Sequence, residues 1–554
     1  MIESDGLAAD GDPLAELTAS VRAAAAAVRG GVGEPSAQPR LERSRHQAQG
    51  DYSTNAAMLL APVLGVGPRE IAERLGAEIE GLLGEDLDHA EIAGPGFLNL
   101  VMTDGWHRRA LATVLAAGDQ FGAGGAKVCE RTVIEFVSAN PTGPLVAASG
   151  RHAAYGDALA RILEHHGHSV WREYYFNDAG NQIRLLGASV QARARGAALP
   201  AGGYQGEYVV GLASEIDGSA TVDVDVVAAR AVELLLAQIK ATLVRYGVRF
   251  DRFFSERTLR EGSPSDLEQA LALVEGRGHV YRSEGATWLR TTTFGDDKDR
   301  VLVRSNGEPT YLAADVAYLQ DKRERGFERQ LMPVGSDHHA YVRELKATMA
   351  ALGGDPETLE APLIQFVHLV EGGQAAAMSK RLGSFVTLDD LLDEIGVDAT
   401  RYFMLQRSHD RTLDLDVELA RKKSRENPVY YVQYAHARIA SMLRRLPDER
   451  VAAAVAPDGD WGEAELQVWE RDLVKKLAAF PGELAEAAER RAPHRIAGYA
   501  LELAQVFTSF YENCRVRGAE PETLESQRIA LSLATGRTIA LALGLLGVSA
   551  PDSM

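Results

Sequence analysis

The sequence predicts an α/β protein: a parallel-sheet core between a small α+β domain and a C-terminal all-α bundle. From Arg131 to about Leu415, short β-branched and aromatic runs alternate with helical patterns, as in a parallel sheet with helical crossovers. Strands and helices are mixed before this core, and the pattern beyond Val417 is helical. A chain of 554 residues is too long for one core, so we expect three domains, over 1–110, 111–415 and 416–554.

The first domain is expected to begin with an alanine-rich helix over 14–28, followed by a Gly- and Pro-rich loop over 30–49. Helical patterns then start at Thr54 and run over 68–83, and an apolar strand covers 93–101. This mixture predicts a compact α+β unit.

The core is expected to open with a buried strand over 133–137, a tight turn over 140–144 and a helix over 147–163. In an open α/β sheet such a junction lies at the carboxyl edge, where helix N–H groups face phosphate. Two stretches interrupt the core: the Gly- and Tyr-rich segment 198–213, with Tyr204-Gln-Gly-Glu-Tyr208, and a helical run over 227–246. Dinucleotide and Walker fingerprints are absent from the sequence, so dehydrogenase and P-loop functions have no support.

The last domain is expected to open with a long helix at Asn427, continue through an acidic loop over 446–462 and close with helices over 493–510 and 523–546. Two cysteines without ligand spacing, Cys129 and Cys514, predict free buried thiols and no zinc ribbon. The N-terminus has no basic start or apolar stretch, and no run approaches membrane-spanning length, so we expect a cytosolic protein.

A net charge of -19 argues against a general nucleic-acid binder, which needs a broadly basic surface. Local basic clusters occur at 421–425, at 444–445, and at 490–491 with 494–495. Each cluster either holds nucleic acid locally or is a solvated helix face.

Several segments resemble arginyl-tRNA synthetases, a class I aminoacyl-tRNA synthetase family. The string Glu135-Phe-Val-Ser-Ala-Asn-Pro-Thr-Gly-Pro144, with Gly150-Arg151 and Tyr155-Gly-Asp-Ala-Leu-Ala-Arg161, resembles the family's first nucleotide-binding motif. Further resemblances lie at 51–55, 94–99, 434–438, 510–516 and 546–554, so they span the chain. The resemblance implies a Rossmann-like catalytic core, an N-terminal domain on the tRNA elbow and a C-terminal anticodon-binding bundle.

The same resemblance implies the reaction. ATP and arginine form arginyl-adenylate and pyrophosphate, and arginine is then transferred to the 3′ end of tRNA(Arg). It further implies that Mg²⁺ accompanies ATP, that no tightly bound cofactor is needed, that the enzyme is a cytoplasmic monomer, and that bound tRNA must precede activation.

Arginine selection needs carboxylates placed for the planar guanidinium fork. Asp315 follows Tyr311 by four residues, so the two share a helix face, and the carboxylate is expected beside the phenol. By resemblance, the residues that bind arginine are Glu135, Asn140, Tyr311, Asp315 and Asp337. The alternatives are a surface acid for Asp315, a salt bridge for Glu135 and a turn amide for Asn140.

Further residues are assigned by resemblance. For ATP they are Pro141, Gly143, Ser149, Gly150, Gly335, His338, Met378, Ser379 and Lys380. Lys380, Arg381 and Ser149 are expected to be catalytic, since cations aimed at the pyrophosphate stabilise charge that builds in the transition state. The alternative for Lys380 is a solvated loop lysine. His338-His339 lacks a third ligand at metal spacing, so no metal site is expected.

For tRNA the residues are Phe97 and Asn99 at the elbow, and Tyr434 and Arg438 in the bundle. The alternative for the first two is a strand-end aromatic and a turn-capping amide.

The family's turn is usually followed by His-x-Gly-His, whereas this chain has Val146-Ala-Ala-Ser149. The second loop reads Ala377-Met-Ser-Lys380, without the first lysine of Lys-Met-Ser-Lys. Losing one preorganised donor typically costs about 2.7–4 kcal/mol of transition-state stabilisation. Three features are candidates to compensate: the Ser149 hydroxyl, helix N–H groups near Ala148, and the imidazole of His152. The rival functions are a binding protein without catalysis and an adenylating enzyme with a small-molecule acceptor.

Overall fold

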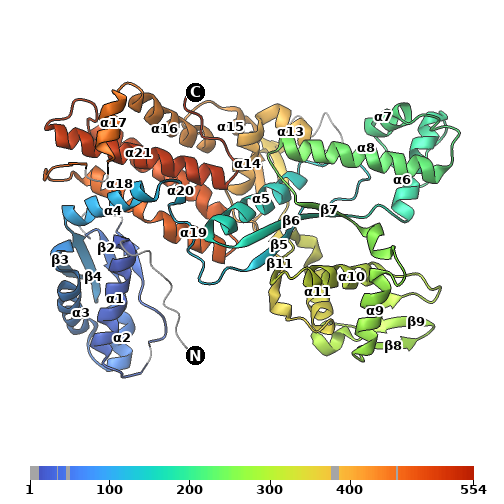
Figure 1. Ribbon diagram of the computed structural model, residues 1–554, viewed down its shortest axis with the longest axis horizontal. Helices are drawn as coiled ribbons and strands as arrows, with labels where there is room; N and C mark the ends of the chain where they lie inside the picture. The colour runs from blue at the N-terminus through green and yellow to red at the C-terminus, as the bar shows by residue number, and fades with distance from the viewer. Residues whose placement is uncertain (1–11, 34, 45–49, 376–385, 457–458) are drawn as a thin grey trace.

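The computed structural model describes residues 12–33, 35–44, 50–375, 386–456 and 459–554. Figure 1 shows the N-terminal unit beneath the helical bundle at one end of the molecule, with the parallel sheet in the middle and two insertions at the other end. The α/β class with its flanking α+β and all-α parts is confirmed.

The N-terminal unit packs helices on one face of a four-stranded antiparallel sheet. Its elements are α1 (Pro13–Arg29), β1 (Leu41–Arg43), β2 (Tyr52–Thr54), α2 (Ala56–Leu64), α3 (Pro68–Leu83), β3 (Leu87–Ala93), β4 (Phe97–Met102) and α4 (Asp104–Ala117). Asp12 caps α1 by accepting from the Leu14 N–H, and Pro13 fits the first turn, where a backbone N–H would be unpaired. The strand expected from residue 93 begins at Phe97, because 94–96 form the turn between β3 and β4.

The core is a five-stranded parallel sheet in the order β13-β11-β5-β6-β7. The strands are β5 (Arg131–Glu135), β6 (Ser169–Phe176), β7 (Arg252–Ser255), β11 (Arg329–Leu331) and β13 (Leu359–Glu360). The crossover helix α5 (Ser149–His166) packs its buried face on the sheet, and a Cβ at Gly156 would lie 2.2 Å from Phe136, so only glycine fits there. The predicted strand and helix are found, each displaced by about two residues.

Two insertions extend from the core. The first contains α6 (Asn181–Ala194), α7 (Glu207–Glu215) and α8 (Val224–Arg245), which share a separate hydrophobic core. The second carries an antiparallel sheet, and its elements are α9 (Asp266–Gly276), β8 (Val280–Ser283), β9 (Ala286–Leu289) and β10 (Arg300–Val303). It leads into α10 (Tyr311–Glu324), which is followed after β11 by α11 (His339–Ala351).

Short strands and helices join the core to the bundle. They are β12 (Val334–Gly335), β14 (Leu363–Ile364), β15 (Val367–Glu371), β16 (Gln374–Ala375), α13 (Leu388–Ile395), α14 (Val397–Leu405), β17 (Leu413–Asp416) and α15 (Val417–Arg421). The bundle consists of α16 (Pro428–Leu443), α17 (Asp448–Ala454), α18 (Val468–Ala478), α19 (Phe480–Glu489), α20 (His494–Asn513) and α21 (Glu522–Leu545).

Helix α21 corrects one expectation. By length and composition it is apolar enough to cross a membrane, whereas we expected no run of membrane-spanning length. Its apolar window is 72% buried inside the bundle, as in the central helix of a soluble protein.

Candidate functional site

The topology of the sheet locates the site. From β5 the chain runs outward through β6 and β7, then returns to the other side of β5 to form β11 and β13. In open α/β sheets ligands bind outside the carboxyl ends of the strands where the order reverses. The crevice is therefore expected between the ends of β5 and β11, and Glu135 is the last residue of β5.

Backbone strain fixes the chain just after Glu135. Val137 and Ser138 have φ angles of 68° and 42°, in the left-handed region that β-branched residues rarely adopt. Such a conformation costs on the order of 1–3 kcal/mol per residue and persists only where its surroundings hold it. Here the Ser138 hydroxyl donates to Glu135 Oε1 at 3.1 Å and accepts from the Tyr175 N–H at 3.1 Å. The strained turn thus orients the Glu135 carboxylate.

Glu135 also has a cationic partner inside the protein. Lys322 Nζ lies 2.6 Å from Glu135 Oε2, and both side chains are buried. The ammonium also stands 4.0 Å from the ring centroid of Tyr318, whose π face favours a cation. The salt bridge that the sequence left as an alternative for Glu135 is therefore present.

Asp315 differs from the other acids around it. Besides its burial, three nearby carboxylates raise its pKa, and each of them is paired with a cation. Glu135 pairs with Lys322, Glu256 with Arg260 at 3.3 Å, and Glu344 with Arg300 at 3.1 Å. Among the residues that the structure describes, none places a cation within ion-pair distance of Asp315. Burial raises the pKa of Asp315 to about 7, and the Tyr341 hydroxyl, which donates to the carboxylate, opposes this rise.

The phenol that contacts Asp315 is Tyr341 rather than Tyr311. Tyr311 is 69% exposed at the first residue of α10, whereas the Tyr341 hydroxyl donates to Asp315 from α11. The expectation that Tyr311 lies beside the carboxylate is thus corrected, while its role toward substrate stays a prediction. Sequence reasoning missed Tyr341, although it ends the Val334-Gly-Ser-Asp-His-His-Ala-Tyr341 string at this same edge.

The turn after β5 is held from the first insertion. Asn140 Nδ2 donates to Gln182 Oε1 at 3.2 Å, and Asn140 Oδ1 accepts from the Asn177 N–H at 3.2 Å. The Tyr208 hydroxyl donates to the Thr142 carbonyl at 3.0 Å. The turn amide foreseen as an alternative for Asn140 is present. The neighbouring Pro141 is buried and Gly143 is half-buried.

Residues 146–149, which stand where the family has its histidines, are held by backbone hydrogen bonds to the segment that begins at Val386. The Ala147 N–H donates to the Val386 carbonyl at 2.8 Å, and the Leu388 N–H donates to Leu145 at 2.7 Å. Gly150 is required here, because a Cβ would lie 2.8 Å from Leu388.

The start of α5 corrects the expectation that its N–H groups are free for phosphate. The N–H groups of Ser149, Gly150 and Arg151 donate to the carbonyls of 146, 147 and 148 in tight turns. The Arg151 side chain is buried and donates to the carbonyls of Gln365, Ser408 and Arg411. Burial lowers the pKa of Arg151 to about 10.

Asp337 and His338 lie close enough to His152 to act on its charge. Burial and then the Arg151 guanidinium lower the pKa of His152 to about 4, and the Asp337 carboxylate and His338 also act on it. Asp337 and His338 lie 3.5 Å apart with side chains more than half exposed. A Cβ at Gly335 would lie 2.6 Å from Asp337 Oδ1, so the Asp337 side chain stands directly over this glycine. His152 is therefore a neutral imidazole near two predicted site residues.

The remaining predicted residues of the crevice, Met378, Ser379, Lys380 and Arg381, lie outside the described residues. In the N-terminal unit, Phe97 is 40% exposed whereas Asn99 is 4% exposed within β4. Phe97 is thus presented at the surface, and Asn99 is not.

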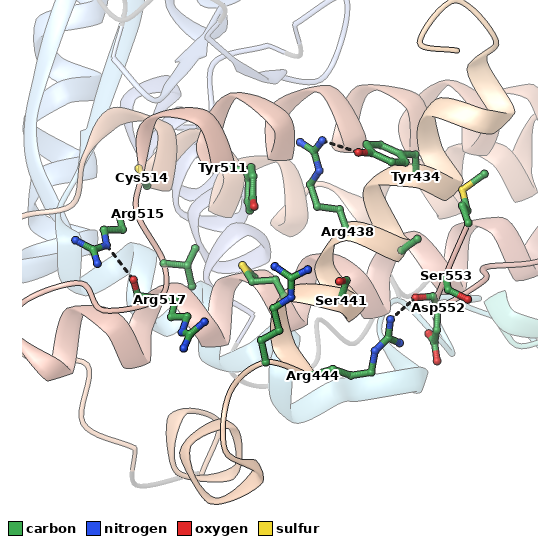
Figure 2. A pocket seen from close by; sticks show the side chains of 15 residues that line it. Tyr434, Arg438, Ser441, Arg444, Tyr511, Cys514, Arg515, Arg517, Asp552 and Ser553 are labelled. Atoms are coloured by element: carbon green, nitrogen blue, oxygen red, sulfur yellow. Dashed lines mark hydrogen bonds between the residues drawn. The ribbon is translucent and has the colours of Figure 1, made fainter. Parts of the chain in front are cut away.

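A basic groove of about 730 Å³ lies in the bundle, between α16, the end of α20 and the C-terminal residues (Figure 2). Arg438 donates to the Tyr434 hydroxyl at 2.9 Å and stands over the rings of Tyr434 and Tyr511, at 4.7 and 5.0 Å. The other arginines that line it are Arg444, Arg445, Arg515 and Arg517. Aromatic faces combined with arginines suit stacked bases and phosphates.

The basic clusters predicted from the sequence differ in whether their arginines are paired with acids. Arg490, Arg491 and Arg495 form ion pairs with Glu486, Glu360 and Glu483, and Arg421 pairs with Glu371 and Glu394. The 444–445 cluster instead faces the groove. Of the two cysteines, Cys514 is buried beside the groove as expected, but Cys129 is exposed.

Comparison with known proteins covers most of the chain. Three family descriptions match: the arginyl tRNA synthetase N-terminal domain over 15–102, the class I (R) tRNA synthetase catalytic domain over 211–437, and the DALR anticodon binding domain over 432–554. The arginine–tRNA ligase of Frankia alni is 44% identical, covering 93% of this chain and 94% of the relative. That of Bacillus velezensis is 42% identical, covering 96% and 97%.

Solved structures agree in fold. The Thermus thermophilus arginyl-tRNA synthetase superposes with a TM-score of 0.75 at 24% identity, covering 97% of this chain and all of that one. A methionyl-tRNA synthetase from Mycobacterium tuberculosis shares the fold more distantly, with a TM-score of 0.54 at 12% identity over 76% of this chain and 91% of that one.

Proposed function

This chain belongs to the arginyl-tRNA synthetases and is an arginine–tRNA ligase, and we propose that its crevice between β5 and β11 holds arginine with the guanidinium on Asp315. Class I synthetases use ATP, so the same crevice holds the nucleotide. The substrates are arginine, ATP and tRNA(Arg).

One observation carries the assignment of Asp315. It is a partly buried carboxylate whose acidic neighbours are all paired, while it has no cation of its own among the described residues. A guanidinium supplies that missing charge and can make two parallel hydrogen bonds with the carboxylate. The Tyr341 hydroxyl already holds the carboxylate in place.

The other predicted residues are proposed around this anchor. Glu135, with Oε2 on Lys322, turns its remaining lone pairs toward the substrate's α-ammonium. Asn140, Tyr311 and Asp337 border the amino acid, and the exposed Tyr311 has room to move onto it.

ATP is proposed to lie along the turn that contains Pro141 and Gly143, with Ser149 and Gly150 at the start of α5 and with Gly335 and His338 opposite. Met378, Ser379, Lys380 and Arg381 supply the second loop, and the two cations face the pyrophosphate. Mg²⁺ would accompany the nucleotide, bound through the phosphates and its own waters, and would neutralise charge on the pyrophosphate.

The reaction then needs positioning rather than covalent catalysis by the protein. An oxygen of the arginine carboxylate attacks the α-phosphorus, the bond to the bridging oxygen breaks, and pyrophosphate leaves with its electron pair. A ribose hydroxyl of the terminal tRNA nucleotide next attacks the activated carboxyl carbon, loses its proton, and AMP leaves.

For tRNA, we propose that the anticodon enters the basic groove at Tyr434 and Arg438 and that Phe97 contacts the elbow. Asn99 supports β4 beneath Phe97, since it is buried. We further propose functional units over 1–110, 111–415 and 416–554, and an enzyme that acts as a monomer in the cytoplasm.

The test of the arginine site is Asp315→Asn, with Asp321→Asn as the control. Asp321 lies on the same helix but is paired with Arg325 at 2.7 Å. Truncating one partner of a buried charge pair costs about 2–5 kcal/mol, so the KM for arginine should rise roughly 30-fold or more in Asp315→Asn. The KM for ATP should stay near the wild-type value, and Asp321→Asn should change the KM for arginine far less. An unchanged KM for arginine in Asp315→Asn would refute the site.

A further inference from the structure

The first insertion forms a unit of its own beside the crevice. Its helices α6, α7 and α8 enclose a separate core that includes Leu186, Val209, Leu212 and Leu235. Figure 1 shows this unit at the end of the molecule farthest from the N-terminal unit. The motif Tyr204-Gln-Gly-Glu-Tyr208 lies between α6 and the start of α7.

This unit holds the turn after β5 by its polar groups. The Thr142 carbonyl accepts from the Tyr208 hydroxyl, and the Asn140 side chain is bonded at both ends, to Gln182 and to the Asn177 N–H. The Tyr208 ring also faces Gly143, where an added Cβ would lie 3.5 Å from it. The position of the turn is therefore set from the insertion side.

The motif explains how Tyr208 reaches the turn. Gly206 has a φ of 114°, which residues with a side chain rarely adopt, and it is the N-cap residue just before α7. Tyr208 follows within the first turn of α7 and packs its ring against the insertion's core. Burial raises the pKa of Tyr208 to about 12.

We propose that Tyr208 is a positioning residue for ATP, and that its hydroxyl fixes the Thr142 carbonyl so that the turn over 140–143 stands where the nucleotide needs it. This inference rests on the proposed ATP site. Tyr208 acts through the backbone of the turn, without touching the reacting atoms. Residues 146–149 offer no imidazole to the nucleotide, so ATP depends on accurate placement of the turn. A displacement of about 1 Å can cost up to about a hundredfold in rate.

The experiment compares Tyr208→Phe with Tyr204→Phe. Both substitutions keep a ring in the insertion's core, but only the first removes a hydroxyl that bonds to the turn. Initial rates of tRNA charging are measured while ATP, arginine and tRNA are varied in turn, together with the thermal midpoint of each variant.

In Tyr208→Phe, kcat/KM for ATP should fall about 5- to 10-fold, the cost of one hydrogen bond near 1 kcal/mol or slightly more. The KM for tRNA should be unchanged, and Tyr204→Phe should stay within about twofold of wild type for every substrate, below the value of a typical hydrogen bond. The proposal is overturned if kcat/KM for ATP is unaffected, or if all three substrates lose equally along with the thermal midpoint. Failure of the arginine site shows separately, in the KM for arginine of Asp315→Asn.

Discussion

Lys322 Nζ lies 2.6 Å from Glu135 Oε2 in the site proposed to receive a second cation, the guanidinium of arginine. The internal lysine neutralises the acid at the end of β5 and leaves Asp315 as the carboxylate without a cation among the described residues around it. Asp315 is thus the carboxylate left to pair with the positively charged side chain of the substrate.

Replacing Lys322 by methionine should destabilise the catalytic core by about 3–5 kcal/mol, because it leaves the buried Glu135 carboxylate unpaired. Adding Glu135→Gln should restore most of that loss, since replacing both members of a buried pair is often nearly neutral. Thermal unfolding of the two single variants and the double variant measures this. Equal midpoints for wild type and Lys322→Met would contradict the role given to the pair.

The value of kcat/KM for arginine should depend on pH, because Asp315 titrates near neutral pH. Its pKa, raised to about 7, means that the free site is largely protonated below pH 7, whereas a guanidinium favours the ionised carboxylate. Binding therefore releases a proton below pH 7, so kcat/KM for arginine should rise with pH toward about 7 and level off above it. The profile should lose this limb in Asp315→Asn. His152, with a pKa of about 4, is neutral across this range and should contribute no limb near pH 7.

His152→Ala should lower ATP-dependent activation about tenfold or more while changing the KM for arginine little. The reason is that a neutral imidazole near Asp337 and His338 can still donate one hydrogen bond toward the nucleotide, where a preorganised donor is worth at least tenfold. ATP–pyrophosphate exchange with tRNA present measures the activation step. His165→Ala, near the other end of α5, is the control. A mild and equal effect on ATP and arginine would rule out His152 as the replacement for the missing imidazoles.

In the basic groove, Arg438→Gln should raise the KM for tRNA without changing the KM for ATP or arginine, because it removes a cation that stands over two tyrosine rings. The salt dependence of tRNA binding should also weaken by about one phosphate contact. Arg490→Gln removes an arginine that is paired with Glu486 outside the groove, so it should leave both quantities near wild type. Identical behaviour of the two variants would contradict the groove as a tRNA site.

The strand-turn-helix at the nucleotide edge could be predicted from sequence because local patterns specify it. The strand expected over 133–137 is β5, over Arg131–Glu135, and the helix expected from 147 is α5, from Ser149. Val137 extends the apolar run in the sequence, but the bend at Val137 and Ser138 ends the strand earlier.

The partners within the site could not be predicted in the same way. Lys322 and Glu135 are 187 residues apart, and the approach of Tyr341 to Asp315 depends on how α11 packs against α10. The basic clusters show the same limit, since 490–491 and 444–445 look alike in sequence. Only the fold pairs Arg491 with Glu360, 131 residues away, and places the groove beside 444–445.

The attachment of the 145–151 segment to the chain beyond the second loop has a consequence for motion. Backbone hydrogen bonds join 145 and 147 to 386 and 388, and Arg151 is fastened to carbonyls of 365, 408 and 411. These contacts tie the start of α5 to the segment that follows the second loop. The turn over 140–143 is held instead by single hydrogen bonds, from the Tyr208 hydroxyl, to Gln182 and from the Asn177 N–H. Hydrogen exchange should accordingly be slow at Ala147 and Leu388 and faster along the turn at 140–143.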